Sequence, residues 1–209
     1  MKKIITLLKY DKPGNIGSLV NLLKNINFKN NNKFSINVSK KKEIIKKSDI
    51  LILPGVGQFD EVMSFLNKNK LINTLKEHSK KNIIIGVCIG MQVLFDSSEE
   101  GNLPGLGFIK GSVRKIKDKK VPIIGWKKTL ISNNDKLIEQ KFDETYLYYL
   151  HSYQVLPNDK KNILMSSVNN NNTITALIKH GNFIGFQFHP ELSSNSGFNI
   201  LESILLKYS

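Results

Sequence analysis

The sequence predicts an α/β fold in which helices flank a central mixed, mostly parallel sheet. In the first half of the chain, short apolar runs alternate with segments of helical apolar spacing, a pattern typical of parallel sheets. These stretches are residues 4–8, 16–26, 34–38, 50–53, 62–75 and 83–87. After about Gly101, short alternating segments predict antiparallel strands. They are residues 113–116, 123–126, 146–151, 164–168, 173–178 and 183–188.

The last predicted element is a helix at residues 197–207, which buries one face against the sheet. Its apolar residues recur at helical spacing and are Phe198, Ile200, Leu201, Ile204 and Leu205. The chain has 209 residues, 40% of them hydrophobic, which is enough for one complete core, and a second core would be cramped. We therefore expect a single domain over residues 1–209.

The chain is strongly basic, with a net charge of +14, and a basic chain suggests a nucleic-acid or anionic-membrane partner. Of its 31 basic residues, however, only Arg114 is an arginine, and contacts to phosphates and base edges favour arginine. The lysines are scattered in stretches such as residues 25–33 and 40–47. We interpret these stretches as solvated surface and expect no nucleic-acid and no membrane partner.

Location and metal content follow from what the sequence lacks. No run approaches the roughly 18 apolar residues that span a bilayer, and no signal-type cleavage site follows Met1. We therefore expect a cytoplasmic protein. A single cysteine cannot form an internal disulfide, and no Cys/His cluster has zinc spacing. We expect neither a metal nor a cofactor.

The only cysteine, Cys88, lies in the glycine-flanked segment GVCIGMQ at residues 86–92, directly after an apolar run. A strand that turns sharply into a helix leaves no room beside its pivot residue, which explains the small neighbours of Cys88. The dipole of the following helix favours the thiolate, the species that attacks. A lone cysteine is usually a small buried hydrophobe, but this setting favours a nucleophile.

A cysteine nucleophile needs a base, and the base needs a partner that orients its ring. His189 follows a predicted strand, and Glu191 lies two residues further on, where its carboxylate can reach the imidazole. The remaining histidines have weaker settings and are His78, His151 and His180. We therefore expect His189 and Glu191 to act with the cysteine.

Donors for a developing oxyanion are expected from residues 54–57, Pro-Gly-Val-Gly, which follow the third predicted strand. Glycine lets the peptide between Gly55 and Val56 turn its N–H toward the sulfur, and the amide of Ile89 supplies a second donor. Alone, such a segment is an ordinary turn. Together with the cysteine and the histidine, it completes an acyl-transfer site.

These motifs together resemble the class I glutamine amidotransferases, with residues 86–92 similar to their cysteine elbow and residues 189–191 to the rest of their triad. More closely, the chain resembles the glutaminase subunits of imidazole glycerol phosphate synthase, nearly from end to end. The shared motifs are Pro13-Gly14-Asn15, residues 53–59, residues 95–100, Gly105-Leu106-Gly107, Val121-Pro122, Gly125-Trp126, His151-Ser152-Tyr153 and residues 185–191.

That resemblance implies a flavodoxin-like amidotransferase domain whose triad hydrolyses glutamine. It also implies a heterodimer with a barrel-shaped cyclase subunit, which receives the ammonia in histidine biosynthesis. The positions that would hold the amino-acid end of glutamine are Gln92, Glu100, Ser152 and Tyr153. Those on the face that passes ammonia to the cyclase are Asn15, Trp126 and Tyr148.

The chain departs from the cyclase-paired subunits in two motifs. Those subunits usually read Pro-His-Met-Gly-Trp-Asn and Pro-Glu-Lys-Ser, whereas residues 122–127 and 190–193 read Pro-Ile-Ile-Gly-Trp-Lys and Pro-Glu-Leu-Ser. The altered positions that we expect on the partner interface are Ile123, Lys127 and Leu192. They suggest an alternative function, a divergent paralogue that works with a cyclase-like partner and supplies ammonia for amidation of a bacterial surface sugar.

Two further alternatives come from other classes of protein. A non-catalytic module that only regulates a partner would not need a complete triad, and a free-standing cysteine peptidase would need an open cleft. Glu100 and residues 151–153 indicate a small amino acid instead. We also expect the free chain to be nearly silent, with the peptide between Gly55 and Val56 turned away until a loaded partner binds.

Overall fold

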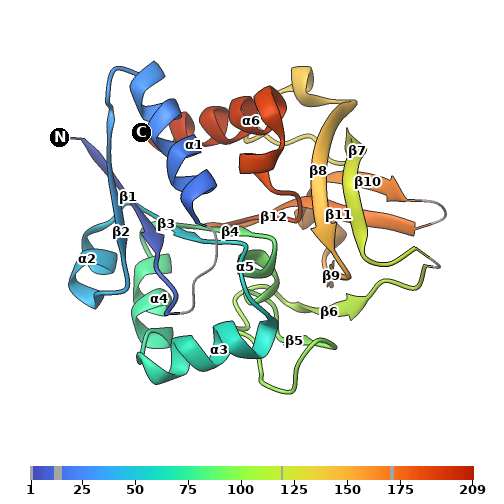
Figure 1. The fold of residues 1–209 in the computed structure, drawn as a ribbon, viewed down its shortest axis with the longest axis horizontal. Helices are drawn as coiled ribbons and strands as arrows, with labels where there is room; N and C mark the ends of the chain where they lie inside the picture. The colour runs from blue at the N-terminus through green and yellow to red at the C-terminus, as the bar shows by residue number, and fades with distance from the viewer. Residues whose placement is uncertain (1, 12–15, 119, 170–171) are drawn as a thin grey trace.

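The computed structural model describes residues 2–11, 16–118, 120–169 and 172–209, and its main element is a nine-stranded sheet (Figure 1). The strand order is β2-β1-β3-β4-β12-β11-β10-β7-β8. The parallel strands are β2 (Phe34–Ser39), β1 (Lys3–Leu8), β3 (Ile50–Leu53), β4 (Ile83–Val87) and β12 (Phe183–Phe186). The antiparallel strands that continue the sheet are β11 (Asn172–His180), β10 (Ile163–Asn169), β7 (Ile123–Ile131) and β8 (Thr145–His151). The predicted mixed sheet is confirmed.

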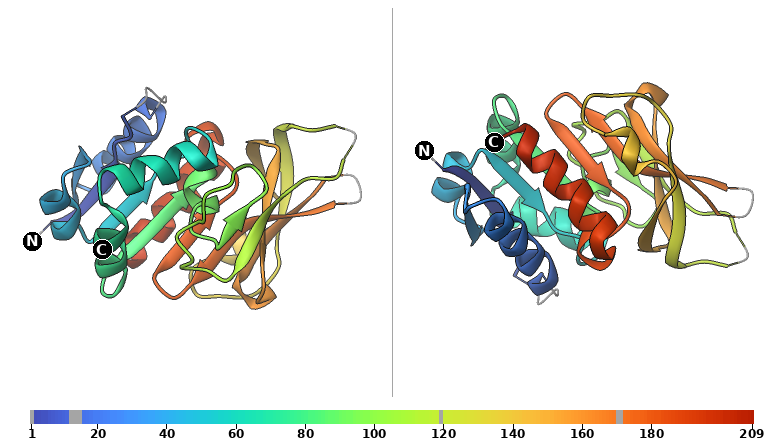
Figure 2. Two further views of the ribbon diagram at one scale, coloured as in Figure 1. Left: turned by 90° about the horizontal axis from the view of Figure 1, so that it is seen from below. Right: turned by 90° about the horizontal axis from the view of Figure 1, so that it is seen from above.

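Helices cover both faces of the parallel half of this sheet (Figure 1, Figure 2). Those on one face are α1 (Gly17–Lys29) and α6 (Ser194–Lys207). Those that pack on the other face are α2 (Lys42–Lys47), α3 (Phe59–Lys68), α4 (Ile72–Ser79) and α5 (Ile89–Gln92). Within the described ranges, no helix is both long and apolar enough to cross a membrane.

Strand β3 shows why the sequences of the parallel strands are continuous apolar runs. Successive side chains point to opposite faces of a strand. Ile50 and Ile52 therefore pack with α1 and α6, whereas Leu51 and Leu53 pack with α3 and α4. A strand buried on both faces needs apolar residues at every position.

The predicted helical segment at residues 62–75 is in fact divided between α3 and α4. Lys70 has a φ of 52°, a left-handed conformation that ends helices, and its N–H donates to the carbonyl of Asn67 at 2.9 Å. The N–H of Leu71 then donates to the carbonyl of Leu66 at 2.9 Å. The apolar spacing continues across this turn, so periodicity alone does not reveal it.

A second, three-stranded sheet lies beside the antiparallel half of the main sheet (Figure 1). Its strands are β5 (Ser97–Ser98), β6 (Gly111–Lys115) and β9 (Tyr153–Pro157). The sequence patterns do not predict β5, β9 or α2, and Ile45 is the one buried side chain of α2. A helix this short and lysine-rich carries no apolar stripe that a pattern could detect.

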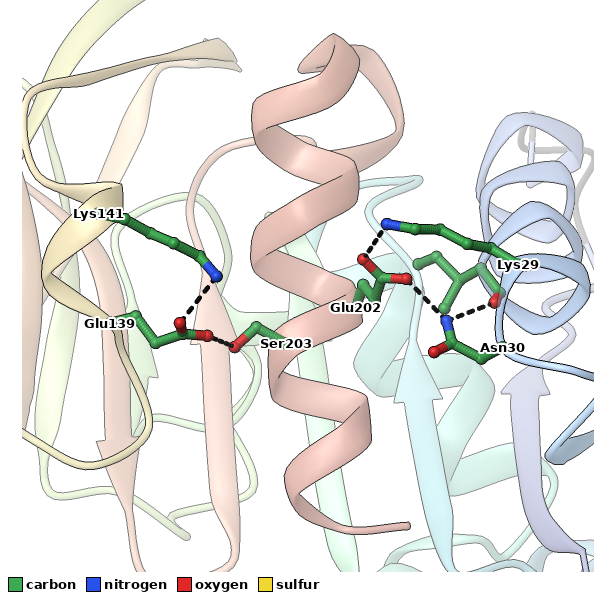
Figure 3. A network of polar contacts seen from close by, with 7 residues as sticks. Lys29, Asn30, Glu139, Lys141, Glu202 and Ser203 are labelled. Carbon is green, nitrogen blue, oxygen red and sulfur yellow. Dashed lines mark hydrogen bonds and ion pairs between the residues drawn. The ribbon is translucent and has the colours of Figure 1, made fainter.

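Helix α6 is held between its neighbours by two carboxylates (Figure 3). Glu202 is 9% exposed and accepts hydrogen bonds from Lys29 Nζ and Asn30 Nδ2, both at 2.7 Å. On the other side of the helix, the Ser203 hydroxyl donates to Glu139 Oε1 at 2.6 Å. Glu202 thus fixes α6 to the end of α1.

We expect Glu202→Ala to lower the free energy of unfolding by about 1–3 kcal/mol, because it removes the nearly buried acceptor that Lys29 Nζ and one Asn30 amide hydrogen share, while Asn30 Nδ2 keeps its bond to the Ile26 carbonyl. Glu77→Ala is the matched control, since Glu77 forms an exposed ion pair with Lys80, and its loss should change the free energy of unfolding much less. Urea unfolding measures both values. Equal losses would show that the Glu202 contacts add nothing beyond a surface pair.

Candidate functional site

The candidate site lies where three adjacent parallel strands end. β3, β4 and β12 are neighbours in the sheet, and residues 54–57, Cys88 and His189 follow them in that order. Parallel strands end at one edge of a sheet, where loops carry chemistry in open α/β folds. The strand order therefore brings together segments that are more than a hundred residues apart.

Cys88 is the pivot of a strained turn between β4 and α5. Its φ of 49° and ψ of −110° are unusual for a residue with a side chain. A Cβ on Gly86 would lie 2.4 Å from the carbonyl oxygen of Gly90, and one on Gly90 would lie 2.1 Å from the carbonyl oxygen of Leu53. Backbone thus fills the space on both sides of the pivot, which accounts for the small residues in the motif.

The surroundings of the Cys88 sulfur include two polar groups besides the histidine. Sγ lies 3.9 Å from the carbonyl oxygen of Leu150, to which its thiol form can donate, and Gln187 Nε2 donates toward Sγ at 3.7 Å. Gln187 is fully buried, and it is not among the predicted site residues although it lies within the motif at residues 185–191. Helix α5 spans only four residues, so its dipole is that of a single turn.

His189 and Glu191 form a buried pair beside the cysteine. The imidazole Nδ1–H donates to Glu191 Oε1 at 2.9 Å, and both side chains are less than 10% exposed. Burial acts to lower the pKa of His189, but hydrogen bonds to Cys88 and Glu191 and their negative charges outweigh it and raise the pKa to about 10. At neutral pH the imidazole therefore carries a proton.

The predicted oxyanion segment adjoins this pair. A Cβ on Gly55 would lie 2.9 Å from His189 Cε1 and 3.1 Å from Cys88 Cβ, so only a glycine lets the loop approach so closely. Ile89 is the first residue of α5, where N–H groups have no partner within the helix. On its other side, the loop at Val56 and Gly57 borders a cavity of about 600 Å³.

Two of the predicted substrate-binding residues are in direct contact. Gln92 Nε2 donates to the carbonyl of Tyr153 at 3.2 Å, and His151 Nδ1–H donates to the same carbonyl at 2.8 Å. Ser152 lies between His151 and Tyr153 and is half-buried. These bonds tie the start of β9 to the helix that follows the nucleophile.

Glu100 follows β5, at the same end of the small sheet as Tyr153. Its Oε2 accepts a hydrogen bond from the N–H of Phe59, the first residue of α3, at 2.9 Å. Burial raises the pKa of Glu100, the Phe59 bond acts to lower it, and Asp60 and Glu61 act to raise it. The carboxylate is thus fixed beside the end of the oxyanion segment.

The predicted interface residues divide between the two faces of the β7–β8 pair. Trp126 is 48% exposed and packs edge to face against the half-buried Tyr148, with ring centroids 6.0 Å apart. Leu192 is exposed in the short helix η3 (Pro190–Leu192). Asn15 lies outside the described residues.

The prediction is wrong for Ile123, which is 2% exposed and belongs to the core. Alternation places it on the inner face, together with the half-buried Lys127. Ile124, which is 56% exposed, takes its place beside Trp126. We name as the β7–β8 face the exposed side chains of Ile124, Trp126, Tyr146 and Leu150 together with the half-buried Tyr148.

We predict that His151 makes folding sensitive to acid. Burial lowers its pKa to about 4, the bond to Tyr153 acts to raise it, and the nearby His189 lowers it further. Between about pH 4 and 6.5 the unfolded chain therefore binds the extra proton, so stability falls as the pH is lowered through this window, by up to about 3 kcal/mol. Urea unfolding at both ends of the window should show a weaker pH dependence in His151→Gln. If His151→Gln showed the same pH dependence of stability as the unchanged chain, another group would be its cause.

Comparison with known proteins identifies the family of the chain. The family model for class-I glutamine amidotransferases matches residues 15–207. The chain is 37% identical over 207 residues to imidazole glycerol phosphate synthase subunit HisH 2 of Methanococcus maripaludis, covering 97% of this chain and 98% of that protein. It is 36% identical to subunit HisH of Oceanobacillus iheyensis, covering 95% and 96% of the two chains.

Solved structures share the fold at low sequence identity. A glutamine amidotransferase of Thermotoga maritima superposes with a TM-score of 0.72 at 14% identity, over 100% of this chain and 98% of that one. The glutaminase domain of the CTP synthase of Trypanosoma brucei, with bound acivicin, has a TM-score of 0.65 at 15% identity, over 99% and 94%. By the family match and these full-length relatives, the chain belongs to the class-I glutamine amidotransferase family.

Proposed function

We propose that this chain is the glutaminase subunit of an imidazole glycerol phosphate synthase, which passes ammonia from glutamine to a barrel-shaped cyclase subunit in histidine biosynthesis. The main support is the placement of a strained Cys88 against the buried pair of His189 and Glu191, where three parallel strands end. The names of the full-length relatives support the pathway. In this proposal residues 1–209 are one amidotransferase domain.

In the proposed reaction, Cys88 Sγ attacks the side-chain amide carbon of glutamine, and the carbonyl electron pair moves onto the oxygen. The N–H groups of Val56 and Ile89 stabilise that oxyanion. His189 gives its proton to the departing nitrogen, which leaves as ammonia, and a γ-glutamyl thioester remains. Water, deprotonated by His189, then attacks the thioester and releases glutamate. Glu191 holds the imidazole in the orientation that both steps need.

The amino-acid end of glutamine is proposed to lie between α5 and the small sheet. The Glu100 carboxylate suits the substrate ammonium, and the donors of Ser152 and Tyr153 suit its carboxylate. Gln92 positions this end through its bond to the Tyr153 carbonyl. A carboxylate and several donors gathered in this way fit the charged end of a free amino acid better than a peptide chain.

The free chain is proposed to rest with the oxyanion segment turned away from the sulfur. Gly55 has no side chain to oppose rotation, and the cavity beside Val56 and Gly57 leaves room for the peptide to turn. A partner loaded with its ligand would favour the active orientation. This arrangement prevents glutamine from being hydrolysed when no acceptor is ready.

The β7–β8 face is the proposed docking surface for the cyclase. Exposed aromatic and aliphatic side chains that gather on one face are typical of protein interfaces. Leu192 extends this surface, because η3 packs against β8. Ile124 joins Trp126 there, in place of the buried Ile123.

Complementation tests the proposal. A histidine auxotroph that lacks its own glutaminase subunit should grow without histidine when it expresses this chain together with the cyclase from the same genome. The Cys88→Ala variant should not support growth at low ammonia, since it supplies no nitrogen. Failure of the active chain, with both proteins present in soluble form, would contradict the histidine assignment.

The surface-sugar paralogue is retained as a second candidate because of Leu192. This residue is 42% exposed on the proposed docking surface, at the position where the cyclase-paired subunits usually carry a lysine. Losing one partner of a charge pair across an interface weakens binding unless the other protein has changed to match. Normal growth without histidine after deletion of this gene, in a host with no second copy, would favour the second candidate.

A further inference from the structure

Ser193 stands at the start of α6 and is fully buried. A serine at this position normally accepts a hydrogen bond from the first turn of the helix that it precedes. The Ser193 side chain makes no such bond to α6. Its hydroxyl is used elsewhere, and its partners suggest a role in the site.

The Ser193 hydroxyl joins the catalytic turn to strand β8. It donates to the carbonyl of His189 at 2.7 Å and accepts from the N–H of Tyr148 at 2.9 Å. The N–H of His189 in turn donates to the carbonyl of Tyr148 at 2.9 Å. Both main-chain groups of one β8 residue are therefore bonded to the turn between His189 and Ser193. Among the described residues β8 is the last strand of the sheet, so no further strand lies beside it to bond these groups.

The same strand carries the exposed β7–β8 face. The Tyr148 ring packs against Trp126 on that face. Two residues further on, Leu150 is 46% exposed, and its carbonyl oxygen lies 3.9 Å from Cys88 Sγ. A shift of β8 by a fraction of an ångström would thus reach both the cysteine and the histidine.

We infer that Ser193 is a positioning residue that fixes His189 to β8 and so couples the β7–β8 face to the Cys88–His189 pair. The positioning role stands on the contacts alone. The coupling role rests on the proposed function, in which a partner docks on this face. Without the hydroxyl, His189 keeps one main-chain bond to β8 but loses the second connection, so movement of the strand no longer sets the position of the imidazole.

Ser193→Ala tests both parts of the inference. In the free chain, we expect alkylation of Cys88 by iodoacetamide to slow and its pH profile to shift, because the imidazole is less firmly placed. With the partner present, we expect kcat for glutamine to fall by about 10- to 100-fold while KM stays unchanged. Ser193→Thr keeps the hydroxyl and should retain most of the alkylation rate and most of kcat.

Ser196→Ala is the matched control. Ser196 accepts a hydrogen bond from Thr145 Oγ1 at 3.1 Å, which also joins α6 to β8 but does not involve the catalytic turn. The inference is overturned if Cys88 alkylation and kcat in Ser193→Ala match those of the unchanged chain. It is also overturned if Ser196→Ala lowers both values as much as Ser193→Ala does. Alkylation needs neither glutamine nor partner, so it judges Ser193 even if the proposed pathway is wrong. If the partner did not stimulate glutamine hydrolysis by the unchanged chain, that result would count against the proposed pathway alone.

Discussion

Cys88→Ala should abolish glutamine hydrolysis, lowering kcat by at least about 10⁴-fold, because no other group can form the thioester. Alanine is smaller than cysteine and removes only the sulfur, so the fold should persist. Glutamate release is the measurement, made with enzyme concentrated enough to detect the residual rate. A variant that kept a tenth of the activity would rule out Cys88 as the nucleophile.

His189→Asn is the companion to that variant. It removes the proton donor for the departing ammonia. We expect kcat to fall almost as far as in Cys88→Ala, because the effects of residues that act as a unit are not additive. The double variant with Cys88→Ala should be no worse than Cys88→Ala alone. If the fold-loss in kcat of the double variant equalled the product of the two single losses, the two residues would not act in one reaction step.

Gly90→Ala should be the second large effect, a loss of at least about 3 kcal/mol in the free energy of unfolding. The added Cβ would lie 2.1 Å from the carbonyl oxygen of Leu53, and backbone of a buried strand cannot move aside cheaply. The elbow would then lose its contact with β3. Urea unfolding or a melting curve measures the loss.

Gly181→Ala separates steric overlap from backbone strain. Gly181 has a φ of 55° and nothing within 4 Å of its would-be Cβ, so alanine there costs only strain, about 1 kcal/mol. Gly90 has no such φ, and its expected loss comes from overlap alone. If the two variants were equally stable, close packing would not explain the glycines around Cys88.

The triad is predictable from the sequence because each of its parts is local. A glycine-flanked cysteine after an apolar run marks a turn, and a carboxylate two residues from His189 marks an oriented imidazole. The parallel strand pattern then implies that their ends meet at one edge of the sheet. The roles of Cys88, His189 and Glu191 nevertheless stay predictions until activity is measured.

Other features depend on pairings that no local pattern encodes. The contacts of Ser193 and Gln187 require that β8 and β12 approach the nucleophile from distant parts of the chain. The misplacement of Ile123 has a different cause. Two adjacent isoleucines do not by themselves indicate which one faces the core, and the alternation of β7 around the exposed Trp126 decides it.

The most direct test is glutamate release by the purified chain, alone and with the cyclase from the same genome carrying its nucleotide ligand, with Cys88→Ala as the blank. We expect a slow rate for the free chain and a rise of at least about tenfold with the loaded cyclase, all of it dependent on Cys88. Glutamate release that persists in Cys88→Ala, or none under either condition, would contradict a partner-controlled cysteine glutaminase.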